Sequence, residues 1–489
     1  MESVLNRYWW WLALTGLVIV ILLLNRHRIL GWLAQVPTKG AVLLLAAAVI
    51  AVAGMFASPT GDEPHYLVMT QSMLRDGDFD LRNNYEQRSF SEYYAGELGA
   101  HVIEIGEHWY PVHGIGLPML AVPWYAIGGR PGVVLMLALI SVAGIRLTWL
   151  TLERAGIDAA SAGVAAVVAG FTLPLASLSS QIFPEVPAFL LVALALYTLV
   201  VAPVRKRHVV AFSIAVALLP WLHPKFALLS VALLAGAVLI HRRQMLDARI
   251  VVGGLAFLVT VAAMVTLFNA WYGAPLPPNI MPRVPGDENW LVTIAGHFFR
   301  RPSVGLTGAL FDQQYGLLIA SPVFLLVVPG VVLLWRRSRA LAATAVLMFV
   351  AIYLPAGVWG DWHGGFSSPA RFFVPAVPSL ALGLAAILET RDRVLHRLFT
   401  ILAFASFAYA YVMVTLPYWI RYGDEGTGRN YFVAFLDRLS GLDLTPIVPS
   451  LKNVTETTWL TVIAYVVAVT LFTAFALRRA GSSISASGA

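Results

Sequence analysis

The feature that most constrains this sequence is a series of apolar runs, each long enough or nearly long enough to cross a lipid bilayer as a helix. A helix needs about 20 apolar residues to cross the hydrocarbon core, where every backbone polar group must be bonded within the chain. Hydrophobic residues make up 59% of the chain and charged residues only 12%, which excludes a water-soluble fold. The runs are 9–24, 40–57, 131–151, 159–178, 186–202, 209–222, 225–240, 250–270, 315–335, 340–358, 372–390, 398–416 and 457–477. They predict an all-α polytopic membrane protein with thirteen transmembrane helices.

The segments between the runs form two alternating sets. Short connections rich in Arg and Lys lie at 25–39, 203–208, 241–249, 336–339, 391–397 and after 477. Longer connections rich in Pro, Gly, aromatic and acidic residues lie at 58–130, 179–185, 271–314, 359–371 and 417–456. Because Lys and Arg collect in cytoplasmic loops, the basic set is predicted to be cytoplasmic. We therefore expect a multi-pass plasma (inner) membrane protein with its N-terminus outside and its functional site on the periplasmic or extracytoplasmic side.

Residues 116–128 are apolar but do not fit this alternation as a span. If they crossed the bilayer, all the later basic clusters would face outward. We therefore expect an interfacial or re-entrant helix there, which Pro118 and Pro123 favour. The whole chain, 1–489, is expected to form a single membrane-embedded module with a disordered Gly/Ser/Ala-rich tail at 481–489.

The composition also excludes several classes of function. The chain has no cysteine, so thiol catalysis, disulfides and zinc-thiolate or iron–sulfur sites are excluded. The net charge of +7 is clustered between apolar runs, as in topology-setting loops, and predicts no nucleic-acid partner. The sequence contains no P-loop, dinucleotide fingerprint, nucleophile elbow or HExxH motif.

The stretch 58–80, which opens the first long polar segment, carries the leading candidate residues. Asp62 and Glu63 lie side by side at the expected membrane boundary, and Pro64 suits the first turn of a helix. Apolar residues from Tyr66 to Leu74 recur at helical spacing, so this helix is expected to lie on the bilayer surface. A carboxylate there is costly unless it has a role. Asp62 could take a proton from a hydroxyl, hold a divalent cation, or cap the helix.

Other candidates for substrate binding lie in the outer loops or at the outer ends of the runs. They are Glu63, His65, His113, Glu185, His223, Lys225, Asp361, His363 and Arg371. A lone histidine is more often a hydrogen-bonded structural residue, and Glu185 is either a second acid in the same cavity or a solvated helix end. Lys225 and Arg371 lie on the outer side against the charge rule, so an anion such as a lipid phosphate would explain them. The alternatives are contact with ordinary head groups for Lys225 and a structural ion pair for Arg371.

Two further groups of outer residues are weaker candidates. Asp312, Gln313 and Tyr315 stand at the head of another run and could line a donor or acceptor cleft. Tryptophans are plentiful near the outer edge and are expected mostly in the interfacial belt, although a few could stack on sugar rings.

The motif GlyAspGluProHisTyrLeu (Gly61 to Leu67), together with the overall topology, resembles the GT-C superfamily of integral-membrane glycosyltransferases. Its members include protein O-mannosyltransferases, the lipid A aminoarabinose transferase and mycobacterial arabinofuranosyltransferases. The resemblance implies a GT-C-like fold, a polyprenyl-phosphate-sugar donor, an outward-facing active site, and the first-loop acid, Asp62, as the general base. The chain departs from the family pattern in an extra span before the usual first one and in lacking the soluble C-terminal domain that some members use to bind acceptors.

The expected function is therefore an inverting glycosyltransferase, hexosyl or pentosyl, that moves a sugar from a polyprenyl-phosphate carrier to a hydroxyl of an envelope glycan, lipid or protein. Arg and Lys could hold the phosphate without a metal. Alternatively, Asp62, Glu63 and Glu185 could hold Mg²⁺, Mn²⁺ or Ca²⁺. Two rival functions remain open. A transporter or flippase of lipid-linked sugars or polysaccharides predicts ionisable residues in mid-span, and a structural subunit of envelope synthesis predicts no turnover.

Overall fold

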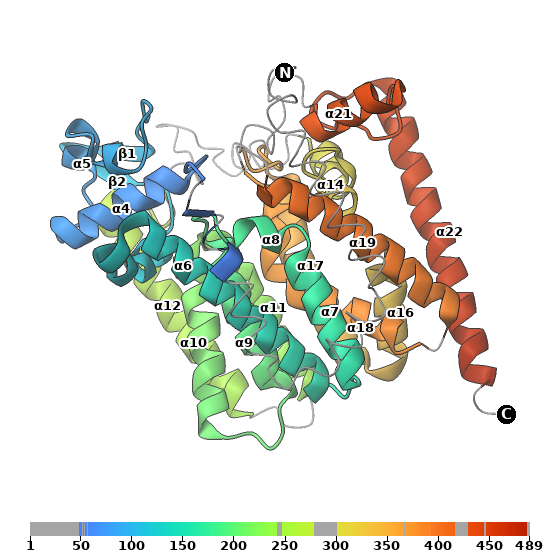
Figure 1. Cartoon of the computed structure of the whole chain (residues 1–489). Coiled ribbons are helices and arrows are strands. Elements are labelled where there is room, and N and C mark those ends of the chain that lie inside the picture. Colours follow the sequence, from blue (N-terminus) through green and yellow to red (C-terminus); the bar gives the residue numbers. More distant parts are fainter. Residues whose placement is uncertain are drawn as a thin grey trace, which may run out of the picture.

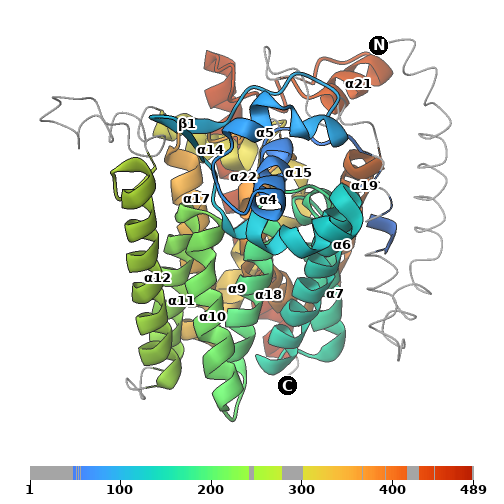
Figure 2. The ribbon, with the colours of Figure 1, turned by 90° about the vertical axis from the view of Figure 1, so that its left-hand side faces the viewer.

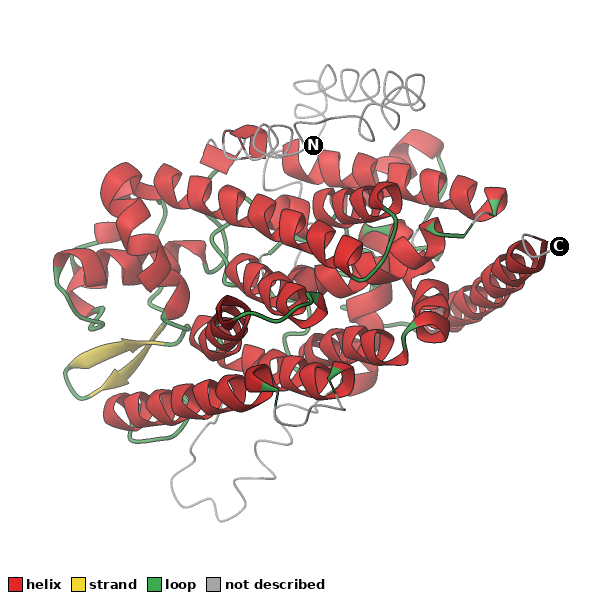
Figure 3. Ribbon diagram, turned by 90° about the horizontal axis from the view of Figure 1, so that it is seen from below, coloured by secondary structure: helices red, strands yellow, loops and turns green. Residues whose placement is uncertain are grey.

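The computed structural model describes residues 48–50, 52, 54–55, 57–241, 247–277, 301–365, 367–390, 392–415, 429–444 and 446–486. Helices dominate these residues, and their only sheet is an antiparallel hairpin of β1 (Val102–Ile105) and β2 (His108–Pro111), as Figure 3 shows. Within the described part, six helices are long and apolar enough to span a membrane. They are Gly116–Arg154, Ala248–Tyr272, Arg339–Val358, Arg371–Leu388, Arg393–Val414 and Glu456–Gly481. The prediction of an all-α polytopic membrane protein is confirmed, whereas the count of thirteen spans stays a prediction, since run 9–24 lies outside the described residues.

The described elements follow the order of the apolar runs. The α-helices are α4 (Glu63–Arg75), α5 (Arg82–Glu86), α6 (Gly116–Arg154), α7 (Ala159–Phe171), α8 (Leu175–Leu178), α9 (Glu185–Val200), α10 (Lys206–Leu222), α11 (Ala227–Ile240), α12 (Ala248–Tyr272), α14 (Pro302–Phe311), α15 (Leu317–Ala320), α16 (Val327–Arg337), α17 (Arg339–Val358), α18 (Val377–Leu388), α19 (Arg393–Thr415), α21 (Tyr431–Ser440) and α22 (Glu456–Ala486). The 3₁₀-helices are η1 (Ser89–Glu92), η2 (Pro224–Phe226), η3 (Pro322–Leu326) and η4 (Arg371–Ala376).

Figures 1 and 2 show that the described helices and strands of three segments predicted as outer loops, 58–130, 271–314 and 417–456, gather at one end of the helical bundle. This end, called the loop end below, carries α4, α5, the hairpin, α14 and α21. Several spans are interrupted near it. Pro224 separates α10 from α11, Pro322 begins η3, and η4 precedes α18. Because proline lacks a backbone N–H, it favours a break at these positions. The breaks bring side chains from separate spans together at the loop end.

The expectation that the helix after Asp62 lies on the bilayer surface is wrong for its first ten residues. Residues 63–72 of α4 are all buried within the protein. The helix packs against α5, η1 and α6. Gln71, on this helix, donates from Nε2 to the carbonyl of Ser89 at 3.1 Å and to the hydroxyl of Tyr125 at 2.9 Å. A buried amide needs such hydrogen-bond partners. Protein rather than lipid therefore surrounds this part of α4.

The segment predicted as a separate interfacial or re-entrant helix forms the first part of α6. Gly129, with φ 56° and ψ −147°, interrupts the helix in a conformation that is essentially reserved for glycine. The backbone then passes close to itself, because a Cβ on Gly132 would lie 2.3 Å from the carbonyl oxygen of Trp124. Residues 116–128 therefore do not continue the span that follows the break.

The expectation of disorder in the tail is wrong for residues 481–486. Helix α22 extends to Ala486, while residues 487–489 lie outside the described part of the chain. Ala and Ser tolerate helical geometry, and a single glycine such as Gly481 costs only about 1 kcal/mol in a helix. A helix that enters this segment can therefore continue through it.

Candidate active site

A cavity of about 400 Å³ lies at the loop end, within the size range of ligand sites. Its ionisable lining comes from six separate segments. Asp62, His113, Glu185, His223, Lys225, Asp361, His363 and Arg371 all line it, with Tyr66, Phe183, Trp359 and Phe372 among the aromatic residues. Asp62 and every leading substrate-binding candidate except Glu63 and His65 therefore line one cavity, whereas the weaker candidates Asp312, Gln313 and Tyr315 do not.

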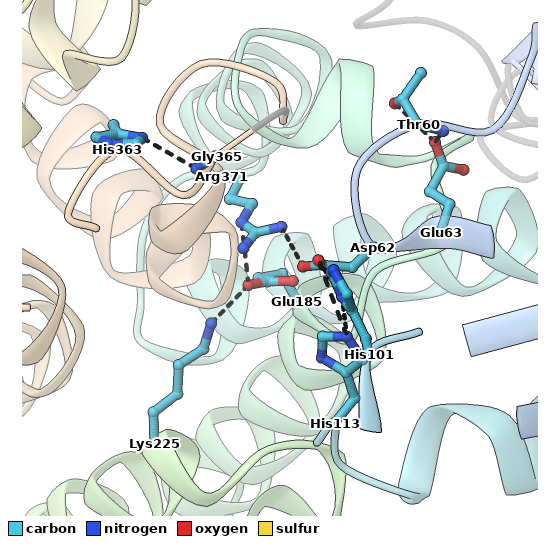
Figure 4. A network of polar contacts seen from close by, with 10 residues as sticks. All are labelled: Thr60, Asp62, Glu63, His101, His113, Glu185, Lys225, His363, Gly365 and Arg371. Atoms are coloured by element: carbon cyan, nitrogen blue, oxygen red, sulfur yellow. Dashed lines mark hydrogen bonds and ion pairs between the residues drawn. The ribbon is translucent and has the colours of Figure 1, made fainter. Parts of the chain in front are cut away.

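Asp62 occupies the N-cap position of α4 but does not cap the helix with its side chain. Figure 4 shows the carboxylate turned toward Arg371 and two histidines. Its Oδ2 lies 3.4 Å from Nη1 of Arg371. Its Oδ1 lies 3.8 Å from Nδ1 of His101 and 4.0 Å from Nε2 of His113. The capping alternative is therefore wrong, and the carboxylate is available to the cavity.

The charge state of Asp62 follows from these neighbours. Burial alone would raise the pKa of the carboxyl group, but electrostatic interactions with His113, Arg371 and His101 outweigh this effect. The pKa of Asp62 is therefore held well below its usual range. The group is ionised at neutral pH, so it can accept a proton or bind a cation but cannot donate a proton.

Opposite Asp62, two cationic side chains surround Glu185 at the start of α9. Lys225 donates from Nζ to Oε1 of Glu185 at 2.8 Å, and Nε of Arg371 lies 4.0 Å from the same oxygen. Only 1% of the Glu185 side chain is exposed. Aromatic rings enclose both cations. Nζ of Lys225 lies 4.3 Å from the ring centre of Phe372, and the guanidinium of Arg371 lies 4.7 Å from that of Phe183. Glu185 is therefore a second acid in the cavity, and its cations are held partly desolvated.

Local turns fix the two cations. In η2 the backbone N–H of Lys225 donates to Nδ1 of His223 at 3.2 Å, so this histidine caps the turn that presents the lysine. Gly364 has φ +78°, and a Cβ there would lie 2.9 Å from Nε of Arg371. A glycine is needed for the loop to pass the guanidinium at this distance. His363 accepts a hydrogen bond from the N–H of Gly365 through Nδ1 at 3.1 Å.

Glu63 lies outside the cavity, which corrects its assignment to substrate or cation binding. Figure 4 shows its side chain with Thr60, away from Asp62. Its Oε1 accepts from the N–H of Thr60 at 3.0 Å, and its Oε2 accepts from the N–H of Ile182 at 2.9 Å. Successive residues at a helix start point in different directions, so adjacency in sequence did not place the two acids together. The expected cation site of Asp62, Glu63 and Glu185 is therefore not formed.

His65 also lies outside the cavity and belongs to a histidine cluster behind it. Its ring stacks on that of His101 at 3.7 Å between centres, and its Nδ1 lies 2.7 Å from the hydroxyl of Tyr85. Burial lowers the pKa of His65 to about 3 and that of His113 to about 4, so both rings are neutral at neutral pH. Sequence reasoning missed His101, whose only signal was its place in the same long loop.

Asp312, a weaker candidate, has a structural role. Its Oδ1 accepts from the N–H of Tyr315 at 2.9 Å, and its Oδ2 accepts from the N–H of Leu451 at 2.7 Å. Burial raises the pKa of Asp312 to about 6, although these hydrogen bonds oppose the shift. The carboxyl group fastens the segment before α22 to the turn after α14 and does not line the cavity.

No protein-family model matches the sequence, and no curated protein matches it significantly. The chain resembles the solved structure of ArnT from Cupriavidus metallidurans bound to undecaprenyl phosphate, with 17% identity and a TM-score of 0.49 over 93% of this chain and 79% of that chain. The apo structure of the same protein gives 16% identity and a TM-score of 0.48 over 90% of this chain and 77% of that chain.

Proposed function

We propose that this protein transfers a sugar from a polyprenyl-phosphate carrier to a hydroxyl acceptor on the extracytoplasmic side of the plasma (inner) membrane. The observation that carries the proposal is the placement of an ionised acid, Asp62, and two cations, Lys225 and Arg371, on one cavity at the loop end. The charge alternation of the connecting segments supports an outward position for that end.

Each group has a role in such a transfer. A lipid carrier presents a phosphate at membrane level, and Lys225 and Arg371 can hold it by charge-assisted hydrogen bonds. Arg371 contacts Asp62 at 3.4 Å, too close for a sugar to lie between them. Donor binding must therefore separate this pair, with the guanidinium turning to the phosphate and Asp62 left to face the acceptor.

The bond changes then balance within the cavity. The acceptor oxygen attacks the anomeric carbon while the bond from that carbon to the carrier phosphate breaks. Asp62 takes the hydroxyl proton, and the cations stabilise the charge that develops on the departing phosphate. Attack opposite the leaving group inverts the anomeric centre. The negative charge lost on Asp62 equals the charge gained by the phosphate, so the total charge is unchanged.

The test compares the wild-type protein with Asp62→Asn in proteoliposomes supplied with a panel of undecaprenyl-phosphate sugars and a membrane extract as acceptor. Mass spectrometry follows the release of undecaprenyl phosphate. We expect turnover to fall by about 10²- to 10⁴-fold, the usual contribution of a general base. Binding of undecaprenyl phosphate should persist, which shows that the variant is folded.

Undiminished turnover in Asp62→Asn would refute the base assignment. The rival transporter or flippase function, in which the lipid-linked sugar moves across the membrane with its phosphate bond intact, predicts no release of the free carrier. The same assay therefore separates the two functions.

A further inference from the structure

Three side chains, two of which line the cavity, bring one possible metal-binding atom each close together. Asp62, His101 and His113 present atoms that all lie within 4.8 Å of one another. Nδ1 of His101 lies 3.3 Å from Nε2 of His113, and Oδ1 of Asp62 lies 3.8 Å and 4.0 Å from these two nitrogens. The two distances to Asp62 exceed the range of a hydrogen bond, so direct bonding does not explain why the carboxylate faces the two rings.

A metal ion does explain this arrangement. The point equidistant from the three atoms lies about 2.2 Å from each, close to the distances of about 2.0–2.2 Å at which zinc binds imidazole nitrogen and carboxylate oxygen. Calcium needs about 2.3–2.6 Å and six to eight oxygen ligands. We propose that Asp62, His101 and His113 bind one divalent transition-metal ion of the zinc type.

The donor types support this choice of metal. Two imidazole nitrogens and one carboxylate favour zinc and its transition-metal neighbours over Mg²⁺ and Ca²⁺, which prefer oxygen ligands. The site therefore differs in both ligands and metal from the all-carboxylate site expected from the sequence.

Neighbouring groups hold the two rings in place. His65 stacks flat on His101, and the hydroxyl of Tyr85 accepts from the backbone N–H of His101 at 3.4 Å. The loop at His113 is fixed by Gly114, where a Cβ would lie 2.3 Å from the carbonyl oxygen of Leu222. Such supporting contacts orient metal ligands before the metal arrives.

A three-ligand site leaves a coordination position for a substrate oxygen. If the proposed function holds, the acceptor hydroxyl would occupy it, and the bound cation would make that hydroxyl more acidic. The proton would pass to Oδ2 of Asp62, the oxygen that faces Arg371 rather than the histidines. Only this role rests on the proposed function, because metal binding by the three side chains does not require it.

The test measures metal on the full-length protein, purified with a tag free of histidine and stripped with chelator. Elemental analysis after incubation with Zn²⁺ should find about one ion per chain, and Co²⁺ should produce visible absorption bands typical of nitrogen and oxygen ligation. His101→Ala and His113→Ala should each weaken Zn²⁺ binding by at least about tenfold and abolish the Co²⁺ bands. His363→Ala, which removes a histidine from the same cavity, should leave both unchanged.

The proposal is overturned if the wild-type protein binds no Zn²⁺, if Mg²⁺ or Ca²⁺ binds more tightly than Zn²⁺, or if His101→Ala and His113→Ala retain full affinity while remaining folded by circular dichroism. If either alanine variant fails to fold, His101→Gln and His113→Gln give the same comparison with less loss of packing. An absent metal together with inactive Asp62→Asn would refute the metal site and leave the proposed transferase intact.

Discussion

Replacing Arg371 with glutamine tests how the cavity controls the charge on its acid. The guanidinium lies 3.4 Å from Asp62 and 4.0 Å from Glu185, and only 11% of its side chain is exposed. Arg371→Gln removes the permanent positive charge nearest to Asp62 and keeps a side chain that can hydrogen-bond. Both carboxylates then face each other across a cavity with Lys225 as the remaining permanent cation among its lining residues.

The size of the effect follows from the distance. An opposite charge within about 4–6 Å lowers a carboxyl pKa by about 1–3 units, which corresponds to about 1.4–4 kcal/mol. Removing Arg371 should therefore raise the pKa of Asp62 by about 1–3 units. The base must be ionised to act, so the acidic limb of the activity–pH profile should move to higher pH by a similar amount.

The assay is kcat/KM for the lipid-linked donor between about pH 3 and 7 in proteoliposomes, at conditions in which the variant still binds carrier. Arg371→Lys is the matched control, since it keeps the charge but loses the planar fork that holds phosphate in two places. It should raise KM and leave the acidic limb near its wild-type position. If Arg371→Gln leaves both the pH profile and KM unchanged, Arg371 neither tunes Asp62 nor holds the donor.

Three further predictions concern other parts of the structure. Lys225→Gln should raise KM for the lipid-linked donor by about tenfold to a hundredfold, because a charge-assisted hydrogen bond is worth about 1.5–3 kcal/mol, and an unchanged KM would exclude Lys225 from donor binding. In the folded protein the pKa of His65 is lowered to about 3, so below about pH 6.5 the unfolded chain binds a proton that the folded protein does not, and stability decreases as the pH decreases. The melting temperature of His65→Phe should therefore decrease less between pH 6.5 and 5 than that of the wild type. An equal decrease would contradict the burial of a neutral His65 ring. Asp312→Asn should lower the free energy of unfolding by about 1–3 kcal/mol, because an amide N–H₂ would then face the N–H of Leu451. Melting curves and faster hydrogen exchange of the backbone amides at 449–452 would show this. Unaltered exchange at these amides would count against the prediction.

The fold class was predictable because membrane burial imposes long apolar runs that need no tertiary information to recognise. The split at His223-Pro224 and the separate segment 116–128 followed from proline and from charge alternation. The broken course of run 315–335 was not predicted, although Pro322, which begins η3, favours a break there. The burial of α4 was also missed, since periodicity reports an apolar surface but not whether lipid or protein covers it.

The candidate site was likewise predictable only in part. Lys225 and Arg371 could be found because each violates the charge rule, and the structure brings Arg371 to Asp62 across 309 residues of sequence. Glu63 was misassigned because sequence adjacency says nothing about side-chain direction. His101 carried no such violation and no motif, so only the folding of the first loop over α4 could reveal it.

The two hydrogen-bonded oxygens of Glu63 have a mechanical consequence for its neighbour. Oε1 fixes the turn at Thr60, and Oε2 accepts from the N–H of Ile182, which links the start of α4 to the short turn that ends at Glu185, 119 residues away in sequence. Each of these buried bonds contributes about 1 kcal/mol and costs more to leave unmade. The spacing between the acids, on which proton removal and phosphate release would depend, is therefore set by a direct bond between the two segments that carry them.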